Sequence, residues 1–341
     1  MPSAKKIVLI TDSVPWCQPL IDELHALLKS DPRVSNAAVE VVDISKGLDL
    51  AAPWPEDWSL VVNRMSARPD AERIASECSF YRELQTSLER WCCDASDHGR
   101  KIINPLHCQL VGASKAQQSC VFASAKVNQP RTVLVKSLAH VEEDARTLTE
   151  SSGTRLFLVK PNVGGRGAAI TKHDVMDAAS MASAPAALEA AMIADGLAVL
   201  QEYIQAADGC VHRVEMIGGS VVYRSRTTMP PDADGAEDYN NCASDVCSLG
   251  KRFKKQIFFD APTDIPPEIV EECARIARAA RMDIGSVEYV LHPEANRAMY
   301  FDINPVSTLA AGAKSVVALP PAAATIHHVH AQYIVDCAAQ L

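Results

Sequence analysis

The sequence has 341 residues, of which 48% are hydrophobic and 22% are charged, a balance typical of a folded globular protein with room for two or three packed units. The formal net charge of −9 argues against a general binder of nucleic acids or anionic membranes, because such proteins need a basic surface. No apolar stretch is long enough to span a bilayer, and the apolar run at residues 7–10 is too short for the core of a signal peptide.

The 11 cysteines are an odd number, scattered along the chain without a CxxC pair. We expect reduced thiols in a cytoplasmic protein, most of them acting as small core hydrophobes. Zinc bound by Cys242 and Cys247 would require two further ligands, for which the sequence shows no candidates at suitable spacing.

The first 110 residues alternate between apolar strands and amphipathic helices. This alternation predicts an open α/β sheet over residues 1–110. Ligands usually bind at the carboxyl ends of such strands, which here are Asp12 with Ser13 and Asn63 with Arg64. The first turn lacks GxGxxG, so a dinucleotide site is not predicted. The predicted strands are 5–12, 39–44, 59–64 and 101–104, and the predicted helices are 19–29 and 80–92.

Residues 111–200 continue with a polar helix opened by Lys115. A lysine at a helix N-terminus is electrostatically unfavourable, which indicates contact with a nucleotide phosphate, although a solvated lysine is the alternative. Further elements are predicted as strands at 131–136, 155–160 and 197–204 and as helices at 114–126, 141–148 and 174–194, the last with Pro185 as a possible break.

A glycine-rich segment follows Lys160, the last residue of a predicted strand. Gly164, Gly165 and Gly167 allow backbone N–H groups to approach and cradle a phosphate, while Lys160 reaches phosphate oxygens as a point charge. The Gly-Lys-Ser/Thr ending of a Walker A loop is missing, so we expect a flexible flap between two strands. A simple tight turn is the alternative.

Polar groups end the predicted strand at 197–204. Gln201, Glu202 and the backbone up to Ile204 offer hydrogen-bonding groups and an acid to an adenine and ribose. Taken alone, the segment also fits an ordinary strand edge.

Three arginines accompany a hairpin predicted around Gly218 and Gly219. Guanidinium groups bind carboxylates and phosphates bidentately and stabilise charge during phosphoryl transfer. Arg213 and Arg226 are our candidates for chemistry, and Arg224 and Arg226 share a strand face. An exposed face with salt bridges is the alternative. The polar segment 227–244 that follows is predicted to be a mobile loop.

A second hairpin is predicted over residues 287–305, and its strands carry carboxylates. Asp302 and Asn304 are two residues apart and therefore project to one face, where the hairpin can place Glu288 beside them. Two carboxylates and an amide oxygen suit a hard cation, Mg²⁺ or Mn²⁺. The alternative is a strand with acids on its solvated face.

Three histidines, His327, His328 and His330, lie on a closing helix predicted at 325–339. No acid or cysteine has complementary spacing, so we interpret them as a helix surface with one packed imidazole rather than a metal site.

The order of these signals resembles the ATP-grasp superfamily over about residues 115–305. Within it the chain is most similar to RimK-type amino-acid ligases and related carboxylate–amine ligases. The resemblance implies an α/β class with an N-terminal open α/β domain (1–110), a central lid subdomain (111–200) and a C-terminal α+β subdomain (201–341).

The resemblance also implies roles for individual residues. Lys115 and Lys160 would contact ATP phosphates, and Gly164, Gly165 and Gly167 would form the flap. Gln201, Glu202 and Ile204 would line the adenosine pocket. Glu288, Asp302 and Asn304 would hold magnesium, and Arg213 and Arg226 would contact the acyl phosphate or the substrate carboxylate.

The implied activity is an ATP- and Mg²⁺-dependent ligase that joins a small carboxylate, such as an amino acid or small peptide, to an amine. A small-molecule kinase and a catalytically silent nucleotide-binding protein are the alternatives. A homodimer is a reasonable expectation, and no nucleic acid or membrane partner is expected. His212 precedes Arg213 where the family commonly has an acid, so the substrates do not follow by analogy.

Overall fold

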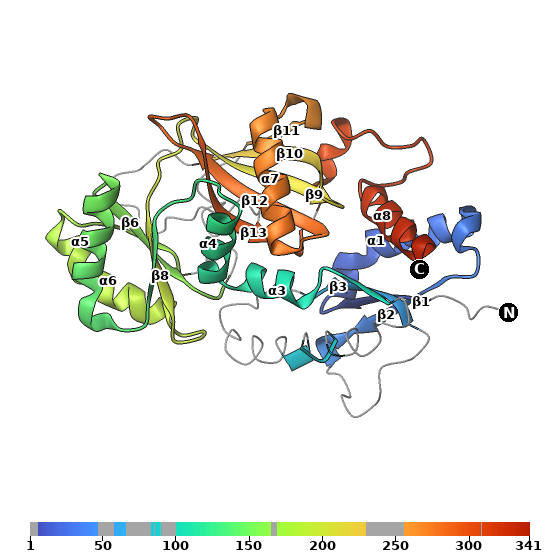
Figure 1. Cartoon of the computed structure of the whole chain (residues 1–341), viewed down its shortest axis with the longest axis horizontal. Helices are drawn as coiled ribbons and strands as arrows, with labels where there is room; N and C mark the ends of the chain where they lie inside the picture. The colour runs from blue at the N-terminus through green and yellow to red at the C-terminus, as the bar shows by residue number, and fades with distance from the viewer. Residues whose placement is uncertain are drawn as a thin grey trace.

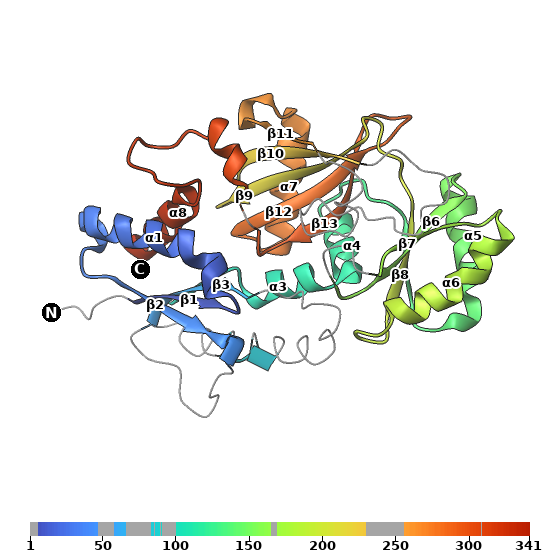
Figure 2. The ribbon, with the colours of Figure 1, turned by 180° about the vertical axis from the view of Figure 1, so that it is seen from behind.

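The computed structural model describes residues 6–46, 58–65, 83–84, 86–88, 90, 100–164, 169–229, 256–307 and 309–341. Within this part of the chain there are three β-sheets. They lie in a row along an elongated molecule, and the sheet in the middle contains β9 (Cys210–Ile217), β10 (Ser220–Thr228), β12 (Ile284–Leu291) and β13 (Ala298–Asn304) (Figures 1 and 2).

The first sheet is parallel and has the strand order β2-β1-β3-β4, as predicted for an open α/β unit. Helix α1 (Val14–Ser30) begins five residues before the predicted start and continues through Pro19. Pro15 lies in its first turn, where the missing N–H has no helical partner to lose. The strands are β1 (Lys6–Thr11), β2 (Ala38–Asp43), β3 (Trp58–Arg64) and β4 (Lys101–Ile103).

The last helix, α8 (His328–Gln340), returns to this first sheet and packs beside α1 (Figures 1 and 2). Ile334 and Val335 of α8 are fully buried in one cluster with Leu24 of α1 and Leu9 of β1. The end of the chain therefore contributes to the core of its beginning, across the predicted domain divisions at residues 110 and 200, which stay predictions.

The second sheet is antiparallel, with the order β5-β8-β6-β7. Helices α5 (Val141–Ser152) and α6 (Ala178–Ala191) cover one face, against which Phe157 and Val159 are buried. Strand alternation therefore turns Lys160 to the opposite face. The strands are β5 (Thr132–Val135), β6 (Leu156–Pro161), β7 (Thr171–Asp174) and β8 (Ala198–Glu202).

Pro185 does not break α6, contrary to the possibility raised by the sequence. The helix runs unbroken to Ala191, with Met181, Ala184 and Leu188 buried against the sheet. Packing of this apolar face outweighs the one backbone hydrogen bond that a proline removes.

The third sheet is antiparallel, with the order β11-β10-β9-β12-β13. One face packs on α7 (Pro267–Ala280), α4 (Lys115–Ser124) and α3 (Leu106–Ala113), whose apolar side chains share its largest core cluster. The sequence predicted neither α3 nor β11. The strands are β9 (Cys210–Ile217), β10 (Ser220–Thr228), β11 (Ile257–Asp260), β12 (Ile284–Leu291) and β13 (Ala298–Asn304).

Short 3₁₀ helices occupy several connections. They span Pro32–Val34, Ile44–Lys46, Leu138–His140, Pro262–Asp264 and Ala311–Ser315. Among the described helices none has both the length and the apolar character needed to cross a membrane. The described cysteines are all free thiols, and all but Cys120 are buried, in agreement with their predicted role as core residues.

Candidate active site

The predicted hairpin forms between β12 and β13 and brings the three candidate metal ligands together. Glu288 lies directly opposite Asp302 in the strand register, and Asn304 is two residues further along the same face. All three side chains are buried, and Asn304 Nδ2 donates to Glu288 Oε1 at 3.2 Å. The register shifts just beyond Glu288, so that Tyr289 pairs with Tyr300 and Phe301 is the extra residue of a bulge.

Arg213 lies beside this group because β9 pairs with β12 and places Arg213 opposite Glu288. Its guanidinium donates to Glu288 Oε1 at 3.0 Å, to Glu215 Oε1 at 2.7 Å and to Ser307 Oγ at 2.9 Å. Burial disfavours the charged guanidinium, but Glu215 and Glu288 outweigh this effect and raise its pKa. Arg213 is therefore a fixed positive charge next to the carboxylates.

Lys115 reaches the same carboxylates from α4. Ser114 caps the helix by accepting a hydrogen bond from the Gln117 N–H, and the Lys115 ammonium forms an ion pair with Asp302. Asn162, just after β6, holds this helix start, because its carbonyl accepts from the Lys115 N–H at 2.9 Å and its side chain accepts from the Ala116 N–H at 3.1 Å. The helix is thereby tied to the end of the strand that carries Lys160.

Lys160 enters from the second sheet. Its ammonium donates to Gln201 Oε1 at 2.7 Å and lies 5.4 Å from the centroid of the Phe301 ring. Burial and the nearby Lys115 charge lower the pKa of Lys160 to about 7, against the opposing influence of Asp302 and Glu288. The two predicted phosphate-binding lysines therefore converge on the carboxylates from two different elements.

An apolar patch adjoins Lys160 at the end of β8. Ile204 packs there with Val211, Val290, Met299 and Phe301. Gln201 lies nearby on the sheet face opposite α5 and α6, where its Nε2 donates to Thr132 Oγ1 at 2.9 Å while its oxygen holds Lys160. Apolar side chains bordered by backbone and amide groups are suited to a heteroaromatic ring.

Two predicted residues are not brought into this group. Glu202 lies opposite Phe157, which faces the helices, and its carboxylate accepts from the Arg131 N–H at 3.0 Å. Arg226 lies opposite His212, one position out of step with Arg213, and so projects from the other face of the third sheet.

Arg226 instead joins Arg224 in an ion pair with Asp260 of β11. Arg224 and Arg226 do share a face, as the sequence indicated, and this face is opposite to the one that carries Arg213. Asp260 was not predicted, because the pairing of β10 with β11 joins residues that are 30 to 36 positions apart in the chain.

The predicted glycine flap is described only in part. Gly164 lies three residues after the end of β6, whereas Gly165 and Gly167 lie outside the described residues. Most of the predicted mobile loop, residues 230–244, also lies outside them.

Two site residues were missed in the sequence. Glu215 binds Arg213 and also accepts a hydrogen bond from the Ser307 hydroxyl. The i, i+2 spacing of Arg213 and Glu215 on one strand face was a usable signal. Ser307, in a loop of small residues, had none, because only the fold brings it to β9.

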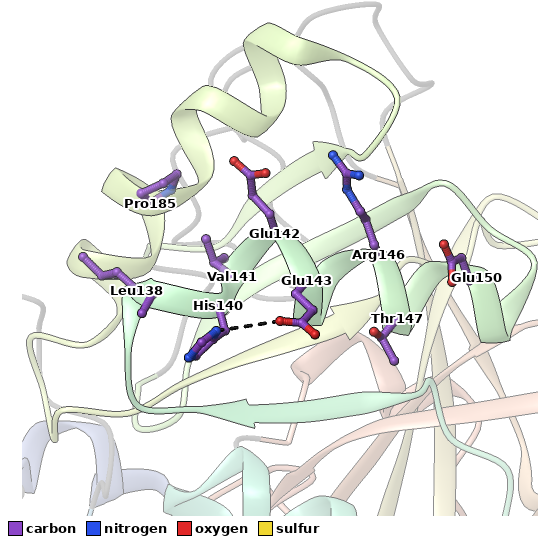
Figure 3. Close-up of a pocket in the computed structure, with 10 residues that line it drawn as sticks. Leu138, His140, Val141, Glu142, Glu143, Arg146, Thr147, Glu150 and Pro185 are labelled. Atoms are coloured by element: carbon purple, nitrogen blue, oxygen red, sulfur yellow. Dashed lines mark ion pairs between the residues drawn. The ribbon is translucent and has the colours of Figure 1, made fainter.

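A separate hollow of about 600 Å³ lies on the outer side of the second sheet, where α5 and the preceding 3₁₀ turn approach Pro185 of α6 (Figure 3). Figure 3 shows His140 paired with Glu143, at 3.8 Å, and acidic side chains spread along α5. This hollow lies on the side of the second sheet that the helices cover, away from the face that carries Lys160.

No family model and no curated protein matched the sequence. Solved structures do match over nearly the whole chain. A structure of the ATP-grasp ligase PsnB with a minimal precursor has a TM-score of 0.64 at 14% identity, covering 98% of this chain and 99% of that one. D-cycloserine synthetase DcsG has a TM-score of 0.61 at 17% identity, covering 96% and 98%. The VanG D-Ala:D-Ser ligase from Enterococcus faecalis has a TM-score of 0.60 at 15% identity, covering 98% and 99%.

At these identities the similarity is one of architecture, and its coverage leaves no major part of either chain unmatched. The protein has the ATP-grasp fold, as the resemblance in the sequence predicted.

Proposed function

We propose that the protein is an ATP- and Mg²⁺-dependent ligase that joins a carboxylate to an amine through an acyl phosphate and releases ADP and phosphate. The observation that carries this proposal is the convergence of Lys115 and Lys160 on Glu288 and Asp302, with Arg213 alongside. Two cations opposite two carboxylates form a site that can hold a metal–triphosphate complex.

The donor set fits magnesium. Glu288 and Asp302 supply carboxylate oxygens, and Asn304 supplies an amide oxygen once its side-chain amide is turned over. Two carboxylates and one amide oxygen leave positions in the coordination shell of the ion for phosphate oxygens and water. Bound there, Mg²⁺ would neutralise charge on the transferred phosphoryl group.

The adenine would lie on the apolar patch formed with Ile204, and Gln201 would border it. The β- and γ-phosphates would then lie near Lys160, and ion pairing with them would shift this lysine toward its charged form. Lys115 would exchange its contact with Asp302 for the nucleotide phosphates. The two lysines thus bind and orient the triphosphate without a Walker A loop.

In the first step the substrate carboxylate attacks the γ-phosphorus, the bond to the β-phosphate oxygen breaks, and ADP leaves. In the second step the amine nitrogen attacks the acyl carbon to give a tetrahedral oxyanion. Collapse of this oxyanion expels phosphate, and the nitrogen loses a proton to leave the amide. Arg213 is positioned to stabilise charge on the acyl phosphate and the oxyanion, because Glu215 and Ser307 hold its guanidinium in place.

The proteins of similar architecture support this reading. PsnB is an ATP-grasp ligase crystallised with a precursor, Mg and ADP, and VanG is a D-Ala:D-Ser ligase. These reactions are those of PsnB and VanG themselves.

The proposal is tested by a screen for phosphate release in the presence of ATP and Mg²⁺. Carboxylic acids, amino acids and short peptides are each offered together with an amine. We expect release only when both substrates are present, and an amide by mass spectrometry. Asp302→Asn should lower turnover at least 100-fold with unchanged circular dichroism, whereas Asp264→Asn, at an exposed carboxylate in the 3₁₀ turn after β11, should not. A stable phosphorylated product would favour a kinase. ATP binding without turnover of any pair would favour a silent nucleotide binder.

A further inference from the structure

A second cluster of polar side chains lies at the carboxyl end of the first sheet, where the sequence marked Arg64 as a possible ligand position. Arg64 is the last residue of β3 and pairs with Thr11, the last residue of β1. It is only 5% exposed, and its guanidinium stacks over the Trp16 ring at 4.5 Å. Helix α1 begins here, and the Ser13 side chain makes no capping hydrogen bond to it. The positive end of the helix therefore faces this position.

Helix α8 brings two imidazoles to the same position. His327 and His330 have ring centroids 6.2 Å apart, and burial together with the Arg64 charge lowers the pKa of both. Glu23 of α1 holds the start of α8 by bonding to His328 at 3.1 Å. The placement of the two rings is thus fixed by the packing of the chain's end on its beginning.

Several nitrogens in this cluster lack partners within the described structure. They are Arg64 Nε, His327 Nδ1 and both ring nitrogens of His330, which is 1% exposed. A buried imidazole with neither nitrogen bonded is unfavourable, because one carries a proton and the other a lone pair. Cys17 bonds to Arg64, and Asp12 and Glu215 are the acids whose charges act on it, although Glu215 is already engaged by Arg213 and Ser307. Arg64 Nε and the ring nitrogens of His327 and His330 therefore keep hydrogen-bonding capacity for an added group.

One residue links this cluster to the proposed active site. Arg64 Nη2 donates to the Ser307 carbonyl at 2.9 Å, and the Ser307 hydroxyl accepts from Arg213 Nη2 at 2.9 Å. Arg213 in turn holds Glu288. Ser307 therefore lies between Arg64 and Arg213 and contacts both, so that the cluster adjoins the proposed active site.

We propose that Arg64, His327 and His330 bind a carboxylate that does not react, carried by one of the two substrates. This inference rests on the proposed ligase function, since the reacting carboxylate must lie at Arg213. A guanidinium fork and imidazole N–H groups match a carboxylate, whereas a second cation beside Arg64 would be repelled. At least one substrate is then an amino acid, a peptide with a free C-terminus or a dicarboxylic acid, and simple amines paired with monocarboxylic acids are excluded.

Binding without ATP tests the proposal, because Trp16 lies against Arg64 and reports on it. The probes are the standard amino acids, glycyl dipeptides, succinate and glutarate, each compared with its amide by tryptophan fluorescence. We expect at least one acid to change the emission, its amide to bind at least tenfold more weakly, and Trp16→Phe to abolish the change. No response to any acid, or equal affinity for acid and amide, would overturn the proposal.

Variants separate binding from structure. Arg64→Gln should weaken binding of the acid at least tenfold. If it does not fold, His330→Leu gives the answer. If His330 contacts the ligand, His330→Leu should bind the acid several-fold more weakly. If His330 is only packed in the core, the variant should bind the acid as tightly as the parent protein, and this result would contradict the proposal. The matched control is His107→Leu, at an exposed histidine of α3, which should bind the acid normally.

The two proposals also fail separately. Asp302→Asn should lose turnover and keep the Trp16 response. A Trp16 response in a protein that forms no ADP would refute the ligase proposal alone. In the turnover assay, exchanging each acid for its amide, first in the amine substrate and then in the carboxylate substrate, identifies which of them carries the group that binds Arg64. Turnover indifferent to both exchanges would refute the Arg64 proposal alone.

Discussion

At the scale of single residues, the site is a balance of close charges. Lys160 is buried against Phe301 and close enough to Lys115 for repulsion, and these effects lower its pKa to about 7 despite Asp302 and Glu288. Arg213 keeps its charge because two carboxylates hold it. The lysine is therefore the cation whose charge responds to a bound phosphate, while the arginine is always charged.

This difference predicts a pH dependence of nucleotide binding. Phosphate raises the pKa of Lys160 above its value of about 7 in the free protein, so ADP binding takes up a proton above that pH. Affinity for Mg–ADP should be steady with respect to Lys160 below about pH 7 and fall, by up to roughly tenfold per pH unit, as pH rises further. Calorimetry between pH 6 and 9 measures the affinity for Mg–ADP. The same measurements on Lys160→Met show how much of the pH dependence comes from protonation of the nucleotide itself. If the affinity of that variant fell equally steeply with pH, the pH dependence would not come from Lys160.

The opposite faces of Arg213 and Arg226 predict opposite outcomes for the same substitution. Arg213→Gln should lower turnover by roughly 100-fold or more, because it removes a charge held beside the reacting groups. Arg226→Gln should leave turnover within about threefold and cost at most about 1 kcal/mol of stability, since its ion pair with Asp260 is partly exposed and Arg224 remains. Steady-state kinetics and urea unfolding measure both. A comparable loss of activity in the two variants would refute the assignment of faces.

At the scale of elements, the β9–β10 hairpin joins the third sheet to α8. Both turn glycines have positive φ, +59° at Gly218 and +80° at Gly219. A Cβ at Gly218 would lie 2.7 Å from the Tyr333 ring of α8, whereas a Cβ at Gly219 would meet nothing within 4 Å. The turn is therefore both a backbone requirement and a packing contact.

Replacing each glycine by alanine separates the two effects. Gly219→Ala should lower the free energy of unfolding by about 1 kcal/mol through backbone strain alone. Gly218→Ala should cost about 1–3 kcal/mol more, because its methyl group collides with Tyr333. Urea denaturation measures both, and Tyr333→Leu in the Gly218→Ala background should recover part of the excess. Equal costs at the two positions would show that the contact with α8 is unimportant.

At the scale of the whole molecule, the proposed nucleotide site is shared between two sheets. Lys160 comes from the second sheet, and the carboxylates and Arg213 come from the third. Helix α4 is tied to the second sheet through Asn162 and to the third through the ion pair of Lys115 with Asp302. A ligand bound there contacts both sheets, and its binding energy adds to the stability of their arrangement.

Nucleotide with metal should therefore stabilise the fold. Mg–ADP at 100 times its dissociation constant should raise the free energy of unfolding by about 2.7 kcal/mol, and removing the metal with a chelator should remove most of the gain. Thermal unfolding followed by circular dichroism measures this. Asp302→Asn should show the response to ADP without the increment from Mg²⁺. A variant stabilised as fully as the parent protein would show that Asp302 does not bind the metal.

Much of this architecture was readable in the sequence, because strand and helix periodicity, turn glycines and the order of polar signals depend on neighbouring residues. The hairpin of β12 and β13 is the clearest example, since a period of two and a short turn are enough to place Glu288 opposite Asp302. Lys115 at a helix start and Lys160 at a strand end were likewise visible locally.

Which face each strand presents, and what faces it, was decided only by the tertiary structure. The register of β10 on β9 turns Arg226 away from Arg213, and the register of β6 on β8 separates Glu202 from Lys160. The packing of α8 on α1 brings His330 to Arg64 from a position 266 residues later in the chain. The sequence by itself determined the elements and their chemistry, because those depend on local geometry. The long-range pairings determined which side chains meet, because a shift of one residue in register moves a side chain to the opposite face of a sheet.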